Sequence, residues 1–375
     1  MLNLLTIVGA RPQFIKAAAL SRALSSGFSQ YISEKLVHTG QHYDRNMSEH
    51  FFSEMGIPEP AYHLGISTGL HGEQTARMLA SLEEILLKEK PDMVLVYGDT
   101  NSTLAGALAA AKLHIPLVHV EAGLRSFNKS MPEEINRIVT DHLSSYLFAP
   151  TTTAVSNLAR EGIVHHAGEN TADLPGVWHT GDIMFDNAVY FGQQAEKKSG
   201  IGQEYGLEPG RFLLATIHRP VNTDDPGRLA GIMEGLAEAA RLNQRQLIFP
   251  VHPRTRPALE KIKGRGKDVI LVPPVSFLEM TWLEKNAACI ITDSGGVQKE
   301  AWFFGKPVVV LRKETEWVEI IQAGNGILAD ADKELILSAV NHFLAEPPVG
   351  FPPVYGNGKA GTEILGILTG MREKS

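Results

Sequence analysis

The chain has 375 residues, which is more than one ordinary hydrophobic core holds, so two domains are expected. Its 43% hydrophobic and 21% charged residues are typical of a globular protein and argue against intrinsic disorder. The formal net charge of −7, without any lysine- or arginine-rich block, argues against a nucleic-acid-binding or membrane-surface protein, although local cations and helix N-termini can still bind an anion.

Cys289 is the only cysteine, and it lies in an apolar run, 287–291. A single cysteine excludes a disulfide framework and a thiolate metal cluster, so we interpret it as a small buried residue in a reducing cytoplasm. The first 16 residues carry their positive charges after the apolar stretch, unlike a signal peptide. No apolar run approaches the roughly 20 residues that cross a bilayer. We therefore expect a cytoplasmic protein without a membrane segment or a nucleic-acid partner.

Short apolar runs, each followed by a turn and then a helical period, recur along the chain in two series. The first series predicts helices at 12–24 and 103–113 and strands at 4–9, 93–97 and 117–120. The second predicts a helix at 228–241 and strands at 212–217, 247–251, 269–272, 288–292 and 308–311. Because these strands are short, apolar and alternate with helices, they indicate parallel sheets that are covered on both faces.

The two series predict an α/β protein with two Rossmann-like domains whose parallel sheets face a central cleft. A weakly patterned stretch, 162–210, separates them, and we place the boundary within it, after residue 175. The first domain then covers 1–175 and the second covers 176–361. In open parallel sheets, ligands bind beyond the C-terminal ends of the strands. The first polar residues after each strand are therefore the candidates for function.

The first strand ends in Gly9-Ala10-Arg11-Pro12-Gln13, and Lys16 follows one turn into the next helix. Proline suits the first turn of a helix, and glycine allows a tight turn from strand to helix. Two interpretations remain open: a plain turn with two exposed cations, or an anion clamp in which Arg11, Lys16 and free helix N–H groups face a phosphate. The dinucleotide fingerprint G-x-G-x-x-G is absent.

Asp99 lies in the polar segment 97–103, between a predicted strand and a predicted helix. Aspartate, threonine, asparagine and serine at that place supply acceptors for the unpaired N–H groups of a helix N-terminus. Taken alone, the segment favours helix capping over a catalytic role.

A cluster of charge follows the predicted strand at 117–120. Glu121 comes directly after the strand, whereas Glu133 and Glu134 lie in the first turn of a helix that begins with proline. Acids there complement the helix dipole, and Glu133 with Arg137 forms an i,i+4 pair. That account leaves Glu121 unexplained. Two carboxylates that face one cleft would instead serve as acid and base.

In the second half, His218-Arg219 and His252-Pro253-Arg254 follow two strands at equivalent positions, which favours an anionic ligand over a purely structural role. The segment Asp293-Ser294-Gly295-Gly296 opens a helix directly after a strand. Unhindered backbone N–H groups and a helix N-terminus converge there, and such a geometry binds phosphate, although a plain tight turn is the alternative. No Walker lysine follows, so nucleotide hydrolysis is not implied.

Several catalytic motifs are absent from the chain. It has no G-x-S-x-G elbow, no H-E-x-x-H pair and no cluster of cysteines and histidines, which argues against a serine esterase and a zinc enzyme. Asp330-Ala331-Asp332 matches the D-x-D letters of metal-dependent sugar transferases. It precedes a late helix instead of ending a core strand, so we interpret the match as chance.

Assembled, these segments closely resemble the non-hydrolysing UDP-N-acetylglucosamine 2-epimerases over almost the whole chain. The matching motifs, in order, are GARPQFIK, GDTNSTLAGALAA, HVEAGLRS, PEEINR, IHRPVNTDD, PVHPRT, TDSGGVQKEA and YGNGKA. The resemblance implies the GT-B fold with UDP in the cleft, a final helix, 362–375, that returns to the first domain, and a homodimer. It also implies that a UDP-activated amino sugar is epimerised at C2 in the cytoplasm, for surface polysaccharide precursors, without a cofactor or a metal ion.

The resemblance also implies roles for individual residues. Asp99, Glu121, Glu133 and His218 would form the catalytic group. The UDP-sugar would be bound by Arg11, Lys16, Arg137, Phe277, Ser294, Gly295, Gly296, Glu300, Arg312 and Trp317. Glu300 would accept the ribose hydroxyls, and the segment at Phe277 would contact the uracil. The reaction would be anti elimination of UDP to a 2-acetamidoglucal, followed by readdition with the C2 proton delivered to the opposite face.

Departures from the family bear on the substrate. Many members read Thr-Glu-Arg-Pro-Glu where this chain reads TEWVE at 315–319, so an indole replaces a guanidinium at Trp317. Together with Ser126-Phe127-Asn128, this run resembles the branch that acts on UDP-2,3-diacetamido-2,3-dideoxyglucuronate.

Gln41 and His252 match a second, activating UDP-sugar site of bacterial members, but Asp44 does not.

Three alternatives remain beside C2 epimerisation. A GT-B glycosyltransferase with a UDP-sugar donor would share the diphosphate site but would not need Asp99, Glu121 and Glu133. A hydrolysing 2-epimerase would release UDP and the free epimerised sugar. A catalytically silent UDP-sugar-binding regulator is the third, and the intact set of acids speaks against it.

Overall fold

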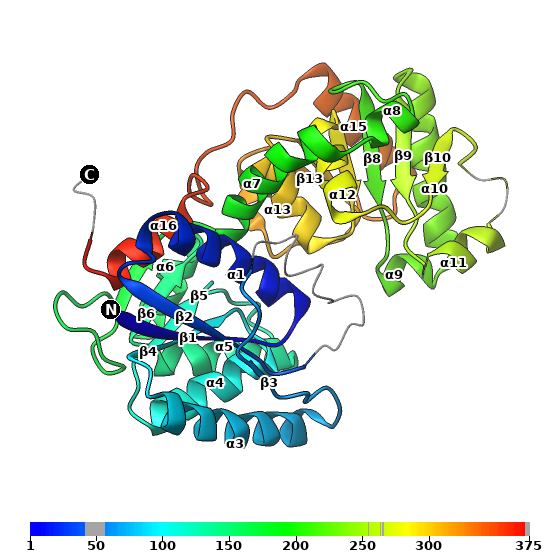
Figure 1. Cartoon of the computed structure of the whole chain (residues 1–375). Helices are drawn as coiled ribbons and strands as arrows, with labels where there is room; N and C mark the ends of the chain where they lie inside the picture. The colour runs from blue at the N-terminus through cyan, green and yellow to red at the C-terminus, as the bar shows by residue number, and fades with distance from the viewer. Residues whose placement is uncertain (42–56, 254, 263, 265, 372–375) are drawn as a thin grey trace. The chain divides into compact units, whose positions relative to one another are not determined.

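Two parallel sheets organise the chain. The computed structural model describes all residues except 42–56, 254, 263, 265 and 372–375. Within the described residues, one compact unit comprises Met1–Asn187 with Val354–Ser375, and the other comprises Ala188–Pro353. Each unit contains one sheet with helices on its faces (Figure 1). The prediction of two α/β units with parallel sheets, the composition of a GT-B protein, is confirmed.

The sheet of the first unit has the strand order β3-β2-β1-β4-β5-β6-β7, and every neighbouring pair is parallel. Its strands are β1 (Leu2–Val8), β2 (Ile32–His38), β3 (Tyr62–His63), β4 (Met93–Tyr97), β5 (Leu117–Val120), β6 (Tyr146–Ala149) and β7 (Gly176–His179). The order reverses between β1 and β4. A ligand crevice is expected at such a switch point.

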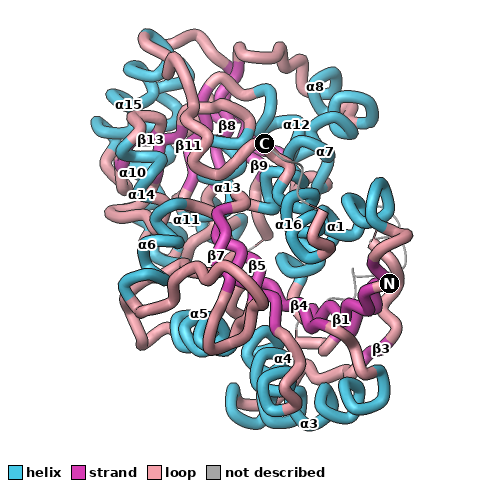
Figure 2. The backbone as a smooth tube through the Cα atoms, turned by 90° about the vertical axis from the view of Figure 1, so that its left-hand side faces the viewer, coloured by secondary structure: helices cyan, strands magenta, loops and turns pink. Residues whose placement is uncertain are grey.

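Helices cover both faces of this sheet. They are α1 (Arg11–Ala23), which continues into a short π-helical turn at Leu24–Phe28, α3 (His71–Glu89), α4 (Asn101–Lys112), α5 (Pro132–Leu143), α6 (Thr152–Arg160), the start of α7 (Ile183–Lys198) and α16 (Ala360–Leu368). Figures 1 and 2 show α1 and α16 side by side on one face, with α3 and α4 on the other.

The second sheet has the order β10-β9-β8-β11-β12-β13, again parallel throughout. Its strands are β8 (Phe212–Thr216), β9 (Gln246–Pro250), β10 (Val269–Val272), β11 (Cys289–Thr292), β12 (Val308–Val310) and β13 (Gly326–Leu328). Its helices are α8 (Ile201–Glu204), α9 (Pro220–Thr223), α10 (Pro226–Leu242), α11 (Arg256–Lys261), α12 (Phe277–Asn286), α13 (Gly295–Phe303), α14 (Val318–Gln322) and α15 (Lys333–Ala345). The switch point here lies between β8 and β11.

The boundary differs from the one expected after residue 175. Strand β7 pairs with β6, so the first unit continues through it and ends inside α7, at Asn187. The chain returns to this unit at Val354, earlier than residue 362. Hydrogen bonds from the main chain to a side chain explain the return. The Asp186 carboxylate accepts the N–H groups of Ala360 at 3.0 Å and Gly361 at 2.8 Å, at the start of α16. A carboxylate that accepts one N–H group on each of its two oxygens stabilises a helix N-terminus.

Small residues bring α4 close to the first sheet. A Cβ at Gly106 would lie 2.8 Å from the Ile7 side chain, and the same helix face carries fully buried alanines. At Gly9, a Cβ would lie 2.0 Å from the hydroxyl oxygen of Ser102. Gly9 is thus needed for the space beside α4 more than for a special turn conformation. This close packing sets the N-terminus of α4 directly against the β1–α1 turn.

Candidate active site

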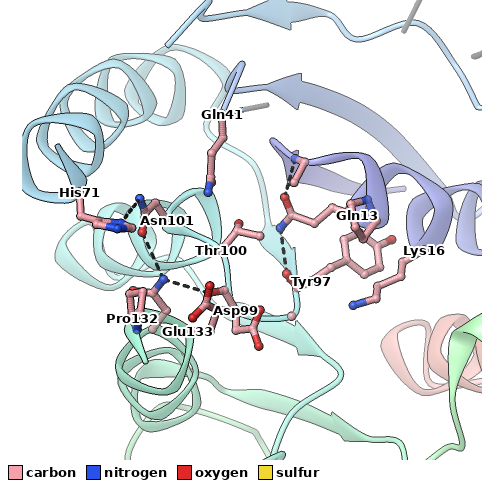
Figure 3. Close-up of a pocket in the computed structure, with 14 residues that line it drawn as sticks. Gln13, Lys16, Gln41, His71, Tyr97, Asp99, Thr100, Asn101, Pro132 and Glu133 are labelled. Atoms are coloured by element: carbon pink, nitrogen blue, oxygen red, sulfur yellow. Dashed lines mark hydrogen bonds between the residues drawn. The ribbon is translucent and has the colours of Figure 1, made fainter. Parts of the chain in front are cut away.

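A pocket of about 240 Å³ lies beyond the C-terminal ends of β1 and β4 in the first unit. Its walls come from the β1–α1 turn, the β4–α4 turn and the starts of α3 and α5, as Figure 3 shows. The lining includes the predicted site residues Lys16, Asp99 and Glu133. The position agrees with the rule that open parallel sheets bind ligands beyond their strand ends.

Gln13 joins the two turns that form the pocket. Its Oε1 accepts the N–H groups of Gly9 at 2.8 Å and Ala10 at 3.0 Å, and its Nε2 donates to the Tyr97 carbonyl at 2.9 Å. The side chain is only 1% exposed, so these bonds are shielded from water. The role of Gln13 was not expected from the sequence. Its place directly after Pro12 in the first turn was the available signal.

The β4–α4 segment contains both a cap and a pocket residue. Thr100 is the N-cap of α4, and its hydroxyl accepts the N–H of Thr103 at 3.2 Å, so the capping prediction holds for Thr100. Asp99 instead pairs with Arg137, whose Nε donates to its carboxylate at 3.1 Å. Burial lowers the pKa of Arg137, but the carboxylates of Asp99 and Glu134 raise it to a net value above its ordinary one. Asp99 thus lines the pocket with its charge balanced.

Glu121 adopts an unusual backbone conformation at the end of β5. Its φ is +74°, a region that residues other than glycine rarely enter and that costs on the order of 1 kcal/mol. The Glu121 carboxylate forms an ion pair with Lys16, and both side chains are 12% exposed. A Cβ at Gly98 would lie 3.1 Å from the Glu121 carboxylate and 3.2 Å from the Lys16 ammonium nitrogen. Glycine at 98 therefore leaves the room in which this pair meets.

A buried network supports the turn beside Glu121. His119 contacts the Asp141 carboxylate at 2.7 Å through Nδ1 and the Gly98 carbonyl at 2.8 Å through Nε2. The Arg125 guanidinium donates to the same Asp141 carboxylate at 2.7 Å. His119 and Asp141 are at most 1% exposed, and buried polar groups are stable only when paired in this way. The network fixes the strand ends from which Glu121 and Asp99 project.

The two glutamates of the first turn of α5 have different environments. Glu134 is 1% exposed, and its carboxylate accepts the N–H groups of Ser126 and Phe127, each at 2.9 Å. Burial raises the pKa of Glu134. These hydrogen bonds and the charge of Arg137 together lower the pKa by more than burial raises it, so the pKa lies below its ordinary value. Glu133 is exposed and lines the pocket. The expected pairing of Glu133 with Arg137 is replaced by a Glu134–Arg137 pair at 2.9 Å, because Arg137 lies three residues after Glu134 and turns toward Asp99.

A relay of amides positions His71 at the pocket wall (Figure 3). The Asp99 carbonyl can only accept, so the group of Asn136 that meets it at 2.9 Å is the NH₂. The same NH₂ donates to Asn101 Oδ1 at 3.3 Å, so Asn101 presents its own NH₂ to His71 Nδ1 at 3.1 Å. Nδ1 of His71 is therefore the acceptor, and the proton of the neutral ring is on Nε2. Sequence reasoning missed His71, Asn101 and Asn136 as pocket residues.

In the second unit, Asp293 orients His218. Asp293 is fully buried and accepts the N–H groups of His218 at 3.1 Å and Arg219 at 3.0 Å, and its carboxylate lies 3.2 Å from His218 Nδ1. Burial raises the pKa of Asp293, but His218, these N–H groups and Asn222 lower it to a net value below the ordinary one. The His218 side chain is 45% exposed. The buried carboxylate holds Nδ1 of this partly exposed imidazole. Nε2 is then oriented for proton transfer or for stabilising a negative charge.

The N-terminus of α13 lies directly after β11, as predicted. Ser294 is its N-cap and accepts the N–H of Val297 at 3.4 Å. A Cβ at Gly295 would lie 2.5 Å from a carboxylate oxygen of Glu316, so an acidic side chain already stands at this helix N-terminus. Arg312 pairs with Glu316 at 2.7 Å. The loop after β12 therefore delivers both Arg312 and Glu316 to the predicted phosphate loop.

Trp317 extends the same loop. The Lys299 ammonium nitrogen lies 4.3 Å from the centroid of the Trp317 ring, a cation–π contact. Thr315 donates its hydroxyl to Gln298 Oε1 at 2.6 Å. Two residues of α13 thus hold the TEWVE run, so the indole has a defined position beside the helix.

Of the remaining predicted residues, Phe277 begins α12 and packs edge-on against Phe191, with ring centroids 5.0 Å apart. Glu300 lies in α13, and Arg11 opens α1 as an exposed residue. Gln41 accepts the N–H of Ser102 at 2.9 Å and lines the pocket of the first unit. The His252 and His218 rings are 6.2 Å apart. Asp44 lies outside the described residues.

Several structural interpretations are also resolved. Cys289 is fully buried, and burial raises its pKa to about 12, as for an inert core thiol. Asp330 pairs with Arg228, and Asp332 caps α15 by accepting the N–H of Glu334 at 2.9 Å, so both acids of the D-x-D match have structural partners. Among the described residues, no group of three His, Cys, Asp or Glu side chains is arranged to hold a metal ion. None of the described helices is both long and apolar enough to span a membrane.

Comparison with known proteins identifies the family. A family model described as UDP-N-acetylglucosamine 2-epimerase matches residues 28–369. The chain belongs to the UDP-N-acetylglucosamine 2-epimerase family. Epimerases are isomerases, so the predicted enzyme class is confirmed at the level of the family. The resemblance drawn from the eight motifs is confirmed with it.

Three relatives within the epimerase family are informative. The UDP-2,3-diacetamido-2,3-dideoxy-D-glucuronate 2-epimerase of Pseudomonas aeruginosa is 49% identical over 98% of this chain and 99% of the relative. The UDP-N-acetylglucosamine 2-epimerase of Escherichia coli is 37% identical over 99% of each chain. The Methanocaldococcus jannaschii epimerase, solved in complex with UDP-GlcNAc and UDP, is 43% identical, with a TM-score of 0.79 over 98% of this chain and 99% of that one.

Proposed function

We propose that this protein epimerises a UDP-2-acetamido sugar at C2 without hydrolysis, and that UDP-2,3-diacetamido-2,3-dideoxyglucuronate is its preferred substrate. The observation that carries the proposal is the set of acids in the first unit. Asp99 and Glu133 line one pocket, and Glu121 is paired with Lys16, which also lines it. The 49% identity to the diacetamidoglucuronate epimerase and the TEWVE run support the choice of sugar.

The acids suit the two half-reactions. In the elimination, a carboxylate takes the C2 proton while the C1–O bond breaks, UDP leaves with the electron pair, and a C1=C2 double bond forms in the acetamidoglucal. In the readdition, a second acid delivers a proton to the opposite face of C2 and the UDP oxygen attacks C1. Two proton-transfer groups on different faces are therefore required. Asp99, Glu121 and Glu133 supply carboxylates from three separate elements, the ends of β4 and β5 and the start of α5.

The leaving UDP needs stabilisation of its growing negative charge. We assign this role to Ser294, Gly295 and Gly296 at the N-terminus of α13, together with Arg312 and His218. The Glu316 carboxylate lies beside Gly295 and pairs with Arg312, so these groups already attract an anion, which the diphosphate would displace. Arg11, Lys16 and Arg137 are the further candidates for the diphosphate and sugar, and Glu300 is the candidate acceptor of the ribose hydroxyls. Phe277 and Trp317 are the candidates for the uracil and the sugar substituents.

Three broader features belong to the same proposal. We propose a homodimer, a cytoplasmic location that a buried free thiol at Cys289 suits, and a role in making precursors of surface polysaccharides. The family match favours epimerisation over a glycosyltransferase, a hydrolysing epimerase and a silent regulator. Sedimentation of the purified protein would test the dimer directly.

The function is tested by proton NMR of the purified protein in D₂O, with UDP-GlcNAc and UDP-2,3-diacetamidoglucuronate in separate tubes. Deuterium at C2 and a manno product are expected with the diacetamido sugar, at a higher rate than with UDP-GlcNAc. Solvent deuterium enters C2 only if that C–H bond breaks, so the label reports on the proposed step.

Other outcomes would reject the proposal. No exchange in either tube, with UDP released only after an acceptor sugar is added, would identify a glycosyltransferase. Accumulation of UDP with a free epimerised sugar would identify a hydrolysing enzyme. A faster reaction with UDP-GlcNAc would keep epimerisation and reject the preferred substrate.

A further inference from the structure

The first unit buries a histidine beside the candidate acids that the proposed mechanism does not use. His119 lies in β5, two residues before Glu121, and its side chain is fully shielded from solvent. Its Nδ1 lies 2.7 Å from Asp141 Oδ1, and its Nε2 lies 2.8 Å from the carbonyl oxygen of Gly98. Both ring nitrogens therefore face an oxygen, and the protons of the ring follow from what those oxygens can do.

Both oxygens are acceptors. The Gly98 carbonyl can only accept, so Nε2 carries a proton. The other oxygen of Asp141, Oδ2, accepts the Arg125 guanidinium at 2.7 Å and the Gly123 N–H at 3.2 Å, and a guanidinium this close keeps a carboxylate ionised. An ionised carboxylate can only accept, so Nδ1 carries a proton as well. The ring is thus an imidazolium.

The neighbouring charges accommodate this buried cation. The Arg125 guanidinium also donates to Glu161, at 2.8 and 2.6 Å, so it lies between two carboxylates. With a protonated His119, the four side chains alternate in sign and their charges balance. With a neutral ring, the buried Asp141 end of the network would have an excess of negative charge, which is costly away from water.

The network holds the main chain on both sides of Glu121. His119 donates to the carbonyl of Gly98 on β4, and Asp141 accepts the N–H of Gly123, two residues after Glu121. Gly98 also lies against the acid itself, because a Cβ there would be 3.1 Å from the Glu121 carboxylate. A strained residue such as Glu121, with its φ of +74°, persists only where the surrounding structure holds it from several sides.

We propose that His119 is a positioning residue for Glu121, and that it acts as a buried imidazolium that joins the turn at Gly98 to the loop after β5. Without the second proton, one of the two hydrogen bonds is lost and the turn and the loop separate. Glu121 would then relax from its strained conformation, and its pair with Lys16 would shift relative to the substrate. The step from position to turnover rests on the proposed function, in which Glu121 transfers a proton.

A histidine that only stabilises the fold is the competing explanation. In that case a substitution would lower the free energy of unfolding and leave kcat of the folded enzyme unchanged. A positioning role lowers kcat while UDP affinity is retained. Thr6→Val is the matched control, because Thr6 is fully buried in β1 of the same sheet and donates to Glu34 in β2 at 2.7 Å.

The experiment compares C2 deuterium exchange, calorimetric titration with UDP and urea unfolding in the wild type, His119→Gln, His119→Asn and Thr6→Val. The amide nitrogen of glutamine takes the place of Nε2 and that of asparagine the place of Nδ1, so each variant keeps one of the two bonds. Both should reduce kcat by about 10–100-fold, since small displacements of a reacting group have effects of this size, with the Kd of UDP within twofold. Thr6→Val should lose stability and keep kcat within twofold. Wild-type kcat in either histidine variant would overturn the inference, as would an equal loss of kcat in Thr6→Val.

A second measurement needs neither a variant nor turnover. Nitrogen-15 NMR of the wild type labelled at histidine, at pH 7.5, should contain one ring with two N–H protons that exchange slowly with water. His119 is the one histidine among the described residues with no exposed surface, and exposed rings exchange these protons rapidly. A protected ring with a single N–H proton would overturn the inference. No C2 exchange by the wild type despite the expected signal would overturn the proposed function, and with it the link to turnover, but not the buried imidazolium.

Discussion

At the scale of single residues, Glu121 combines features that a structural residue does not need. A non-glycine residue at a φ of +74° has a conformational cost, and its carboxylate is held within a pair with Lys16 beside the pocket. Asparagine or glycine would occupy this backbone position with less strain. The strain is tolerated because β5, β6 and the His119–Asp141 pair fix the backbone on either side. Strained residues of this kind cluster at functional sites.

Glu121→Gln is accordingly expected to reduce turnover by about 10²–10⁴-fold, because the amide cannot transfer a proton. UDP affinity should remain within threefold, since the main proposed phosphate-binding group, the N-terminus of α13, lies in the second unit and the amide leaves Lys16 in place. Initial rates with the preferred sugar and calorimetric titration with UDP measure the two quantities. Glu83→Gln, on the exposed surface of α3, is the matched control and should behave as wild type. Turnover of Glu121→Gln near the wild-type rate would remove Glu121 from the catalytic group.

At the scale of elements, the first turn of α5 separates stability from chemistry in two adjacent residues. Glu134 holds the main chain of Ser126 and Phe127 and pairs with Arg137, whereas Glu133 faces the pocket. Both acids lie near the positive end of the helix dipole, so their sequence positions look equivalent. The side-chain directions differ by about 100° around the helix, and that difference decides their roles.

We expect Glu134→Gln to lower the free energy of unfolding by about 1–3 kcal/mol, since bonds from N–H groups to a charged acceptor are replaced by weaker ones. The pKa of Glu134 is lowered in the folded state, so its contribution is present above its unfolded pKa and is lost as the pH falls through the folded one. Glu133→Gln should leave stability within about 0.5 kcal/mol and reduce turnover by about 10²-fold or more. Urea unfolding at pH 7 and pH 3.5 and initial rates distinguish the variants. Equal stability loss in both would contradict the division of roles.

The strands that form uninterrupted apolar runs could be predicted from the sequence, and the shorter or interrupted ones could not. The predicted strands at 93–97 and 117–120 coincide with β4 and β5, because buried parallel strands are continuous apolar runs bounded by polar turns. Strands β2, β3, β6, β7 and β13 were missed. Polar residues at 33–35 interrupt β2, and the other four strands have at most four residues, so their patterns are weak; the missed β7 displaced the domain boundary. At the site, Ser294-Gly295-Gly296 was visible because glycine and serine before a helix are local signals. Gln13 and His71 were not visible, since their roles depend on partners from other elements.

At the scale of the whole molecule, the candidate catalytic groups are distributed over both units. The three carboxylates Asp99, Glu121 and Glu133 belong to the first unit, and His218 with the α13 N-terminus belongs to the second. Each set is positioned by its own sheet, at the switch point of that sheet. Nucleotide binding and proton transfer should therefore respond to different substitutions.

UDP is expected to raise the free energy of unfolding by about 2.7 kcal/mol when its concentration is 100 times its Kd, because it binds the folded state alone. Glu121→Gln and Glu133→Gln should show the same stabilisation as the wild type. Gly295→Val should lose more than about 1.4 kcal/mol of it, which corresponds to tenfold weaker binding. The reason is steric: the two methyl groups of valine would cover the N–H groups at the start of the helix, which the diphosphate would use. Thermal unfolding with and without UDP measures the differences, and undiminished stabilisation of Gly295→Val would place the diphosphate away from α13.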